Sequence, residues 1–178
     1  MIENWFATPI YFNTAALEIV QVANSQFKKR QAEIEALLNF GTWGDQIATT
    51  FDTCKNIISQ YDQFVLEEFI LGQAAQFSPK KYQLTESWVN YAKQHHYQGF
   101  HIHEHDGISG VYYMQTNGQD GSIKFHAPCP QFDRTTDAVT FAPQVGKIIL
   151  FPSWLGHSVG ANPTMHTRIS ISFNLKEI

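Results

Sequence analysis

The second half of the chain is built from short segments that are typical of β-strands. These segments are rich in β-branched and aromatic residues, and turn residues separate them without any intervening helical pattern. Many short strands with no helices between them favour an antiparallel sandwich or barrel, here of about eight core strands. The clearest predicted strands are ESWVNYAK, FHIHEH, ISGVYYMQT, GSIKFHA, VGKIILFPS and RISISFNL.

The first half of the chain has a helical pattern instead. Asn13 or Thr14 can cap a helix whose apolar residues recur at helical spacing as far as Leu38, and a second helix is predicted from about Thr53 to Phe77. No repeat or linker divides the sequence, so residues 1–178 are predicted to form one domain. Its mostly helical part, 1–81, would cover one outer face of a β core formed by 82–178.

Two features of the β half predict local geometry. The TNGQDG segment, Thr116 to Gly121, contains Asn-Gly and Asp-Gly pairs and predicts a β-hairpin. The last strand alternates strictly, with isoleucine, phenylalanine and leucine on one face and Arg168, Ser170, Ser172 and Asn174 on the other. If the polar face lines the inside of an open barrel, Arg168 projects into a cavity. If it does not, that face is simply solvated.

Composition excludes several classes of partner. The formal net charge is −4, and the only basic run is Lys28-Lys29-Arg30, so nucleic acid is not an expected partner. No apolar run approaches the roughly 20 residues that cross a membrane, and no membrane partner is expected. Cys54 and Cys129 stand far apart, which favours a reducing, cytoplasmic location. The sequence leaves a homodimer open.

The GFHIHEHDGISGVYYM segment places three histidines on alternate positions. In a strand, His101, His103 and His105 would share one face, where imidazoles can hold a metal ion such as Fe(II). A further ligand must come from a distant segment. His157 suits this role because it follows the Pro-Ser-Trp-Leu-Gly turn at a strand end, and Arg168 lies eleven residues beyond it.

Several motifs together resemble one family. WFATPIYF near the N-terminus, the HxH segment, SGVYY, LFPSWLGH and RISISFN resemble the 2-oxoglutarate/Fe(II)-dependent oxygenases, and the resemblance extends from Trp5 to Asn174. It implies a double-stranded β-helix, a jelly-roll or cupin-like barrel. It also implies that Fe(II) is the cofactor and 2-oxoglutarate the co-substrate.

The resemblance assigns roles to particular residues. His101 is implied to be the first metal ligand and His157 the distal histidine, while Arg168 pairs with the far carboxylate of 2-oxoglutarate. The rigid fork of donors on arginine gives this residue type a physical reason, because it fits a carboxylate bidentately. Tyr113 matches a position that contacts the co-substrate in related oxygenases. Asn90 and Ser170 are predicted to belong to the same co-substrate site.

The chain departs from the wider superfamily at one position. Most relatives have Asp or Glu two residues after the first histidine, where this chain has His103. Three alternatives for the remaining ligand therefore stay open, namely His103, His105, or Asp106 bending in from the turn. Three neutral imidazoles would leave the site more positive, which still suits an anionic co-substrate.

The resemblance predicts an oxygenase that hydroxylates a small molecule or a peptide. 2-Oxoglutarate would be converted to succinate and carbon dioxide as dioxygen is consumed. The alternative is a cupin-like metal-binding module that binds or senses a small ligand without redox turnover. The HxH segment without a carboxylate favours that alternative, and Arg168 disfavours it.

Overall fold

The computed structural model describes residues 7–40, 47–61, 63–103, 106–129 and 137–178. The described part of the first half of the chain contains three helices, and most of the described strands follow them. The elements are β1 (Tyr11–Thr14), α1 (Leu17–Glu35), β2 (Asn39–Phe40), β3 (Ala48–Thr49), α2 (Ile57–Gln60), α3 (Phe64–Phe77), β4 (Tyr82–Ala92), β5 (Gln98–His101), β6 (Ile108–Gln115), β7 (Ile123–His126), β8 (Ala138–Phe141), β9 (Lys147–Pro152), β10 (His157–Val159) and β11 (Arg168–Glu177).

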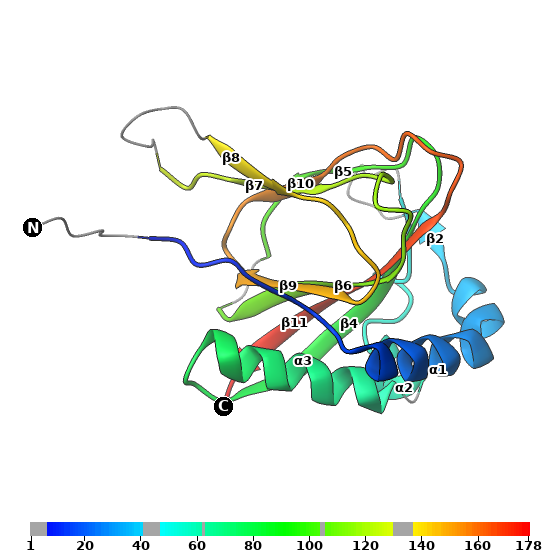
Figure 1. Ribbon diagram of the computed structural model, residues 1–178, viewed down its shortest axis with the longest axis horizontal. Helices are drawn as coiled ribbons and strands as arrows, with labels where there is room; N and C mark the ends of the chain where they lie inside the picture. Colours follow the sequence, from blue (N-terminus) through cyan, green and yellow to red (C-terminus); the bar gives the residue numbers. More distant parts are fainter. Residues whose placement is uncertain (1–6, 41–46, 62, 104–105, 130–136) are drawn as a thin grey trace, which may run out of the picture.

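The strands form two antiparallel sheets that face each other (Figure 1). One sheet has seven strands in the order β1-β9-β6-β11-β4-β3-β2, and the other has four in the order β5-β10-β7-β8. The three helices lie against the outer face of the seven-stranded sheet (Figure 1). The strands β4 to β11 make up the eight predicted from Tyr82 onward, so the predicted barrel and the position of the helices are confirmed.

Alternation along the central strands creates two hydrophobic cores. Tyr112 and Met114 of β6 pack on the helix side with Ile171 and Phe173 of β11, whereas Val111 of β6 faces the space between the sheets. The polar face of β11 therefore points to the inside of the barrel, which was the first of the two alternatives for this face. Arg168 is only 2% exposed, so that face is not simply solvated.

The start of the chain differs from the prediction. Tyr11–Thr14 form β1, which pairs with β9 from Tyr11↔Leu150 to Thr14↔Lys147, so Asn13 and Thr14 do not cap a helix. Helix α1 begins at Leu17 after Ala16, which makes no side-chain capping bond. Pairing with a distant strand outweighs the local capping preference, a tertiary effect that a local pattern does not reveal.

Two other predictions about local structure were wrong. The segment Thr116–Gly121 does not close a hairpin, because β6 and β7 lie in different sheets and the turn connects them. The predicted second helix is divided into α2 and α3. Ile57 and Ile58 are both fully buried, and neighbouring residues on one helix point in different directions, so the apolar spacing did not describe a single face.

The packing of β6 against its neighbours can be tested with a matched pair of glycine substitutions. A Cβ on Gly110 would overlap the Phe173 ring and lie 2.8 Å from the Ile149 carbonyl oxygen, whereas a Cβ on Gly72 in α3 would meet nothing within 4 Å. We expect Gly110→Ala to lower the free energy of unfolding by about 1–3 kcal/mol through overpacking. Gly72→Ala should raise it by about 0.5–1 kcal/mol, because alanine favours a helix. Urea denaturation measures both, and equal effects would contradict the packing described here.

Candidate metal and co-substrate site

A cleft lies between the two sheets and holds most of the residues that the sequence singled out. It encloses about 470 Å³ of space, part of it open to solvent. Its lining includes His101, His103, His157, Tyr113, Arg168 and Ser170. Histidines from the four-stranded sheet thus face an arginine and a tyrosine from the seven-stranded sheet.

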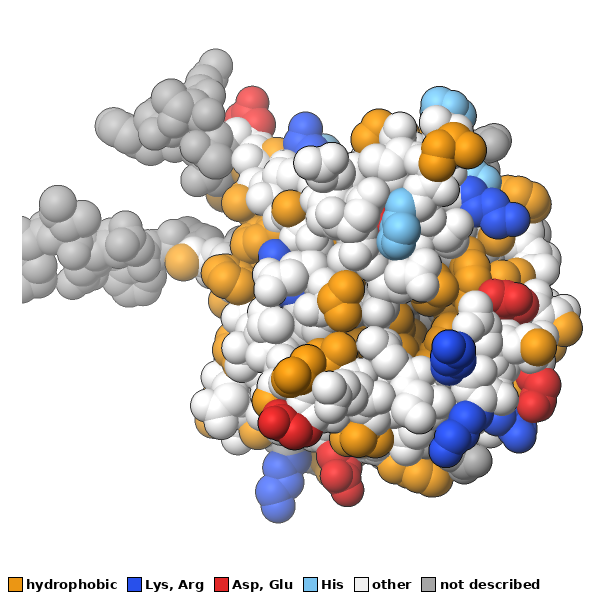
Figure 2. All heavy atoms as spheres, turned by 45° about the vertical axis from the view of Figure 1, so that its right-hand side comes forward, with side chains coloured by type: hydrophobic (Ala, Val, Ile, Leu, Met, Phe, Trp, Pro, Cys, Tyr) orange, Lys and Arg blue, Asp and Glu red, His pale blue; other side chains and the backbone are white. Residues whose placement is uncertain are grey.

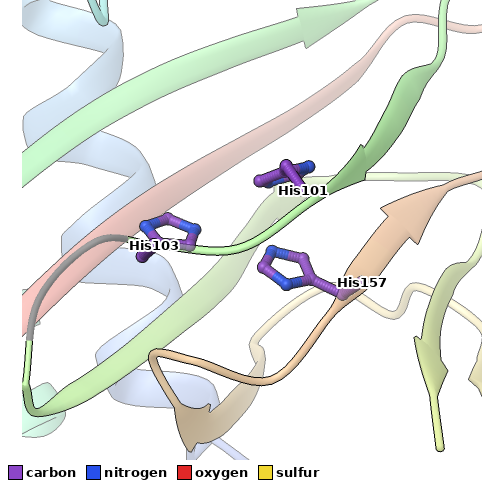
Figure 3. Close-up of side chains that lie close together, drawn as sticks. All are labelled: His101, His103 and His157. Carbon is purple, nitrogen blue, oxygen red and sulfur yellow. The ribbon is translucent and has the colours of Figure 1, made fainter. Parts of the chain in front are cut away.

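The three histidines converge, although His157 comes from a different segment than His101 and His103 (Figure 3). His101 is the last residue of β5 and His157 the first of β10, and the two are direct partners in the sheet. His103 follows β5, where its N–H donates to the Ser153 carbonyl at 3.0 Å. One ring nitrogen from each histidine lies within 4.8 Å of the others, and the His103 and His157 rings are stacked at 5.3 Å between centroids.

Backbone contacts fix the orientation of two of these rings. Nδ1 of His101 lies 2.9 Å from the Gly99 carbonyl oxygen, and Nδ1 of His157 lies 2.9 Å from the Leu155 carbonyl oxygen. A carbonyl oxygen can only accept, so Nδ1 carries the proton and Nε2 keeps its lone pair. In this tautomer Nε2 is free to bind a metal ion, while the other ring nitrogen is held by its backbone partner. The donor set therefore fits a first-row metal ion.

Burial keeps His157 neutral. Loss of solvent is the main reason that its pKa falls to about 3. His101 adds to this lowering, while the hydrogen bond to Leu155 opposes it only in part. A neutral imidazole is the form that binds a metal ion.

Arg168 brings a buried positive charge to the opposite wall. Its Nη1 donates to the carbonyl oxygens of Asp120 at 2.8 Å and Gly121 at 2.5 Å. No carboxylate in the described part of the chain forms an ion pair with it. Burial lowers the pKa of Arg168, whereas Tyr113 and Asp120 raise it, and the guanidinium stays charged because an arginine pKa starts far above neutrality.

The other predicted co-substrate contacts lie near Arg168. Tyr113 is 2% exposed, and burial raises its pKa to about 12, so its hydroxyl keeps its proton and can donate. Ser170 follows Arg168 on the same face of β11 and lines the cleft. Asn90 pairs with Ser170 across the sheet but is not part of the lining, and its Nδ2 donates to the Ser172 hydroxyl at 3.0 Å.

The structure also bears on the other candidate ligands. Asp106 is exposed and does not belong to the histidine group. His105 lies outside the described residues. Sequence reasoning missed Trp88, which lines the cleft and stacks on His103 with 5.8 Å between ring centroids. Its position directly across β4 and β11 from Ser172, on the polar face of the last strand, was the available signal.

The fold and the site together define a double-stranded β-helix with a three-histidine group and a buried arginine. The family described as "Putative 2OG-Fe(II) oxygenase" matches residues 86–174, which include all three histidines and Arg168. The chain belongs to this family of oxygenases, which use Fe(II) and 2-oxoglutarate. Family membership argues against the alternative of a metal-binding module without redox turnover. A search of curated proteins finds no match.

Solved structures share the fold at low sequence identity. The epimerase SnoN from nogalamycin biosynthesis is 14% identical with a TM-score of 0.71, and the match covers 94% of this chain and 78% of SnoN. A Pseudomonas putida prolyl-4-hydroxylase is 12% identical with a TM-score of 0.66, over 96% and 94% of the two chains. HygX from Streptomyces hygroscopicus, solved with nickel, 2-oxoglutarate and hygromycin B, is 11% identical with a TM-score of 0.65, over 94% and 82%.

The neutral state of buried His157 predicts how stability depends on pH. Without metal, the folded protein holds the pKa of His157 near 3, whereas an unfolded histidine titrates near 6.5. Between these two values the unfolded chain binds more protons, so stability should fall as pH decreases from 6.5 towards 3. The slope contributed by one proton is at most about 1.4 kcal/mol per pH unit.

His157→Gln tests this assignment, because glutamine does not titrate. Urea denaturation of chelator-treated protein at several pH values should give a shallower pH dependence for the variant than for the parent. His95→Gln is the matched control, since His95 is exposed and lies outside the histidine group. Identical slopes in the parent and His157→Gln would contradict the burial argument.

Proposed function

We propose that His101, His103 and His157 hold Fe(II), and that Arg168 anchors the far carboxylate of 2-oxoglutarate. The observation that carries this proposal is that one cleft is lined both by three convergent imidazoles and by a buried arginine that pairs with no described carboxylate. Leaving a buried charge unpaired is costly, so this guanidinium is a strong site for a carboxylate ligand.

The residues around Arg168 complete the proposed co-substrate site. Tyr113 can donate a hydrogen bond to the same carboxylate, and Ser170 offers a hydroxyl beside it. Asn90 acts indirectly in this proposal, because its amide holds the hydroxyl of Ser172, which lines the cleft. Trp88 supports His103 by stacking on its ring. His103 occupies the position where most relatives have a carboxylate residue.

The proposed reaction is the hydroxylation of a C–H bond. The substrate, dioxygen and 2-oxoglutarate give the hydroxylated product, succinate and carbon dioxide, and bound iron supplies the activation of dioxygen. The protein residues orient the co-substrate and exclude water, since the cleft is walled by aromatic side chains such as Phe151. We propose a small molecule or a peptide as the substrate, in line with the ligand of HygX and the name of the prolyl hydroxylase.

Broader features of the protein complete the proposal. We propose that residues 1–178 act as one domain, because side chains of α1 and α3 share a hydrophobic core with β6 and β11.

The described helices include none that is both long and apolar enough to cross a membrane. Figure 2 shows Lys and Arg side chains in several separate places on one face, with acidic side chains near them. We propose a cytoplasmic location and a homodimer, and Cys54, which forms no disulfide, agrees with a reducing compartment.

Removing the guanidinium tests the co-substrate assignment. We expect Arg168→Ala to weaken 2-oxoglutarate binding by about 2–5 kcal/mol, because a buried charge-assisted pair is lost, while metal content stays nearly unchanged. Arg168→Lys should recover only part of the loss, since a point charge lacks the fork. Anaerobic calorimetric titration of metal-loaded protein measures the affinity. Lys124→Ala, on the exposed face of β7, is the charge-matched control. Parental affinity in both Arg168 variants would make Arg168 structural.

Substitutions at His103 test the ligand set. His103→Ala should sharply lower iron affinity, and His103→Asp should restore it at least in part, because most of the superfamily uses a carboxylate there. Asp is shorter than His, so the restored iron can be misplaced and turnover reduced on the order of a hundredfold. Iron stoichiometry and succinate formation are therefore measured separately.

Asp106→Ala is the control for this series, because Asp106 is exposed and lies outside the histidine group. It should keep parental iron content and turnover. A severe loss in Asp106→Ala together with a mild effect of His103→Ala would assign the third position to Asp106. Parental iron and turnover in both variants would move the assignment to His105.

A further inference from the structure

The turn between β6 and β7 contains a carboxylate that the proposed reaction does not use. Asp120 is fully buried, and burial of a carboxylate is costly unless hydrogen bonds satisfy its oxygens. Its Oδ1 accepts from the Thr116 hydroxyl at 2.5 Å, and its Oδ2 accepts from the Asn117 N–H at 3.0 Å. His166 Nδ1 lies 3.1 Å from the same Oδ2. The side chain thus fastens the turn to the segment that leads into β11.

The backbone of this turn holds the proposed co-substrate arginine. Both printed hydrogen bonds of Arg168 run from Nη1 to the carbonyl oxygens of Asp120 and Gly121. Among the described residues, none accepts from Nε or Nη2. The turn therefore occupies Nη1 of the guanidinium and leaves Nε and Nη2 as donors for a ligand.

The same turn is shaped for this close approach. Gly121 has a φ of +97°, which side-chain-bearing residues rarely adopt. A Cβ there would overlap the Gly160 carbonyl oxygen and lie 2.8 Å from Arg168 Nη1. Only a glycine lets the guanidinium reach both carbonyl oxygens in this position.

We infer that Asp120 is a positioning residue for co-substrate binding, acting through the backbone carbonyls that orient Arg168. This inference rests on the proposed role of Arg168. The Asp120 carboxylate supports the guanidinium electrostatically but forms no ion pair with it, so the fork is not occupied by an internal anion. A direct pair would compete with the carboxylate of the ligand, whereas the carbonyl oxygens orient the arginine without neutralising its charge.

Two variants separate positioning from simple stabilisation of the turn. Asp120→Ala removes every hydrogen bond of the carboxylate, and Asp120→Asn keeps an oxygen for Thr116 but removes the charge. We expect Asp120→Ala to weaken 2-oxoglutarate binding on the order of tenfold, the scale for losing an outer partner of a binding group, and Asp120→Asn to have a smaller effect. Metal affinity should stay parental, because Asp120 lies outside the histidine group. In turnover, KM for 2-oxoglutarate should rise more than kcat falls.

Ile70→Ala is the control for lost stability, because Ile70 is fully buried in α3 and does not line the cleft. It should lower the melting temperature while leaving 2-oxoglutarate affinity and KM parental. If Asp120→Ala does not fold, Thr116→Val removes one donor to the carboxylate and should weaken 2-oxoglutarate binding in the same direction.

Calorimetric titration of nickel-loaded protein with 2-oxoglutarate, together with thermal denaturation, gives the decisive readouts. The inference is overturned if the Asp120 variants lose stability as Ile70→Ala does but bind 2-oxoglutarate like the parent. Failure of the proposed function has a different signature, since Arg168→Ala would then also bind 2-oxoglutarate like the parent.

Discussion

The site depends on one energetic problem, the burial of a guanidinium inside the barrel. Arg168 is 2% exposed, and a buried charge without a counterion would be unfavourable unless hydrogen bonds or a ligand compensate for it. The protein supplies two backbone carbonyl oxygens and leaves the rest of the fork open. Part of the stability of the folded chain is thus given up to prepare a binding site for an anion, and binding of that anion should stabilise the fold in return.

The alternation of β11 makes this burial tolerable. Ile169, Ile171 and Phe173 pack towards the helices and secure the strand between β4 and β6, so the opposite face can carry polar groups. Helices on only one side of the seven-stranded sheet leave its inner face free to oppose the four-stranded sheet (Figure 1). His101 and His157 come from that second sheet, His103 follows its strand β5, and the arginine comes from the first sheet, so the site forms only when the two sheets close on each other.

The sequence was informative where a pattern repeats along one strand. Alternation in RISISFNL predicted both faces of β11, and the HxH spacing with the turn before His157 singled out His101 and His157 and left His103 as one of three alternatives. It was uninformative where contacts join distant segments. The pairing of β1 with β9, the passage from β6 to the other sheet, and the burial of Asp120 all depend on tertiary neighbours. An Asp-Gly pair is a common turn signal, and nothing local distinguishes a solvated aspartate from one that anchors an arginine.

In the proposed site, three imidazole ligands change the charge balance of the cleft. With a carboxylate ligand, the positive charges of iron(II) and Arg168 would be partly neutralised before 2-oxoglutarate entered. Here burial holds His157 neutral, and the Asp120 carboxylate lies behind the turn and not in the fork. The cleft therefore presents a larger positive potential to a dianion such as 2-oxoglutarate. The two carboxylates of the dianion would meet positive charge at opposite ends of the same cavity. This electrostatic gain gives a physical reason why His103 can stand in the place of an aspartate, provided that a stacked partner such as Trp88 orients the longer side chain.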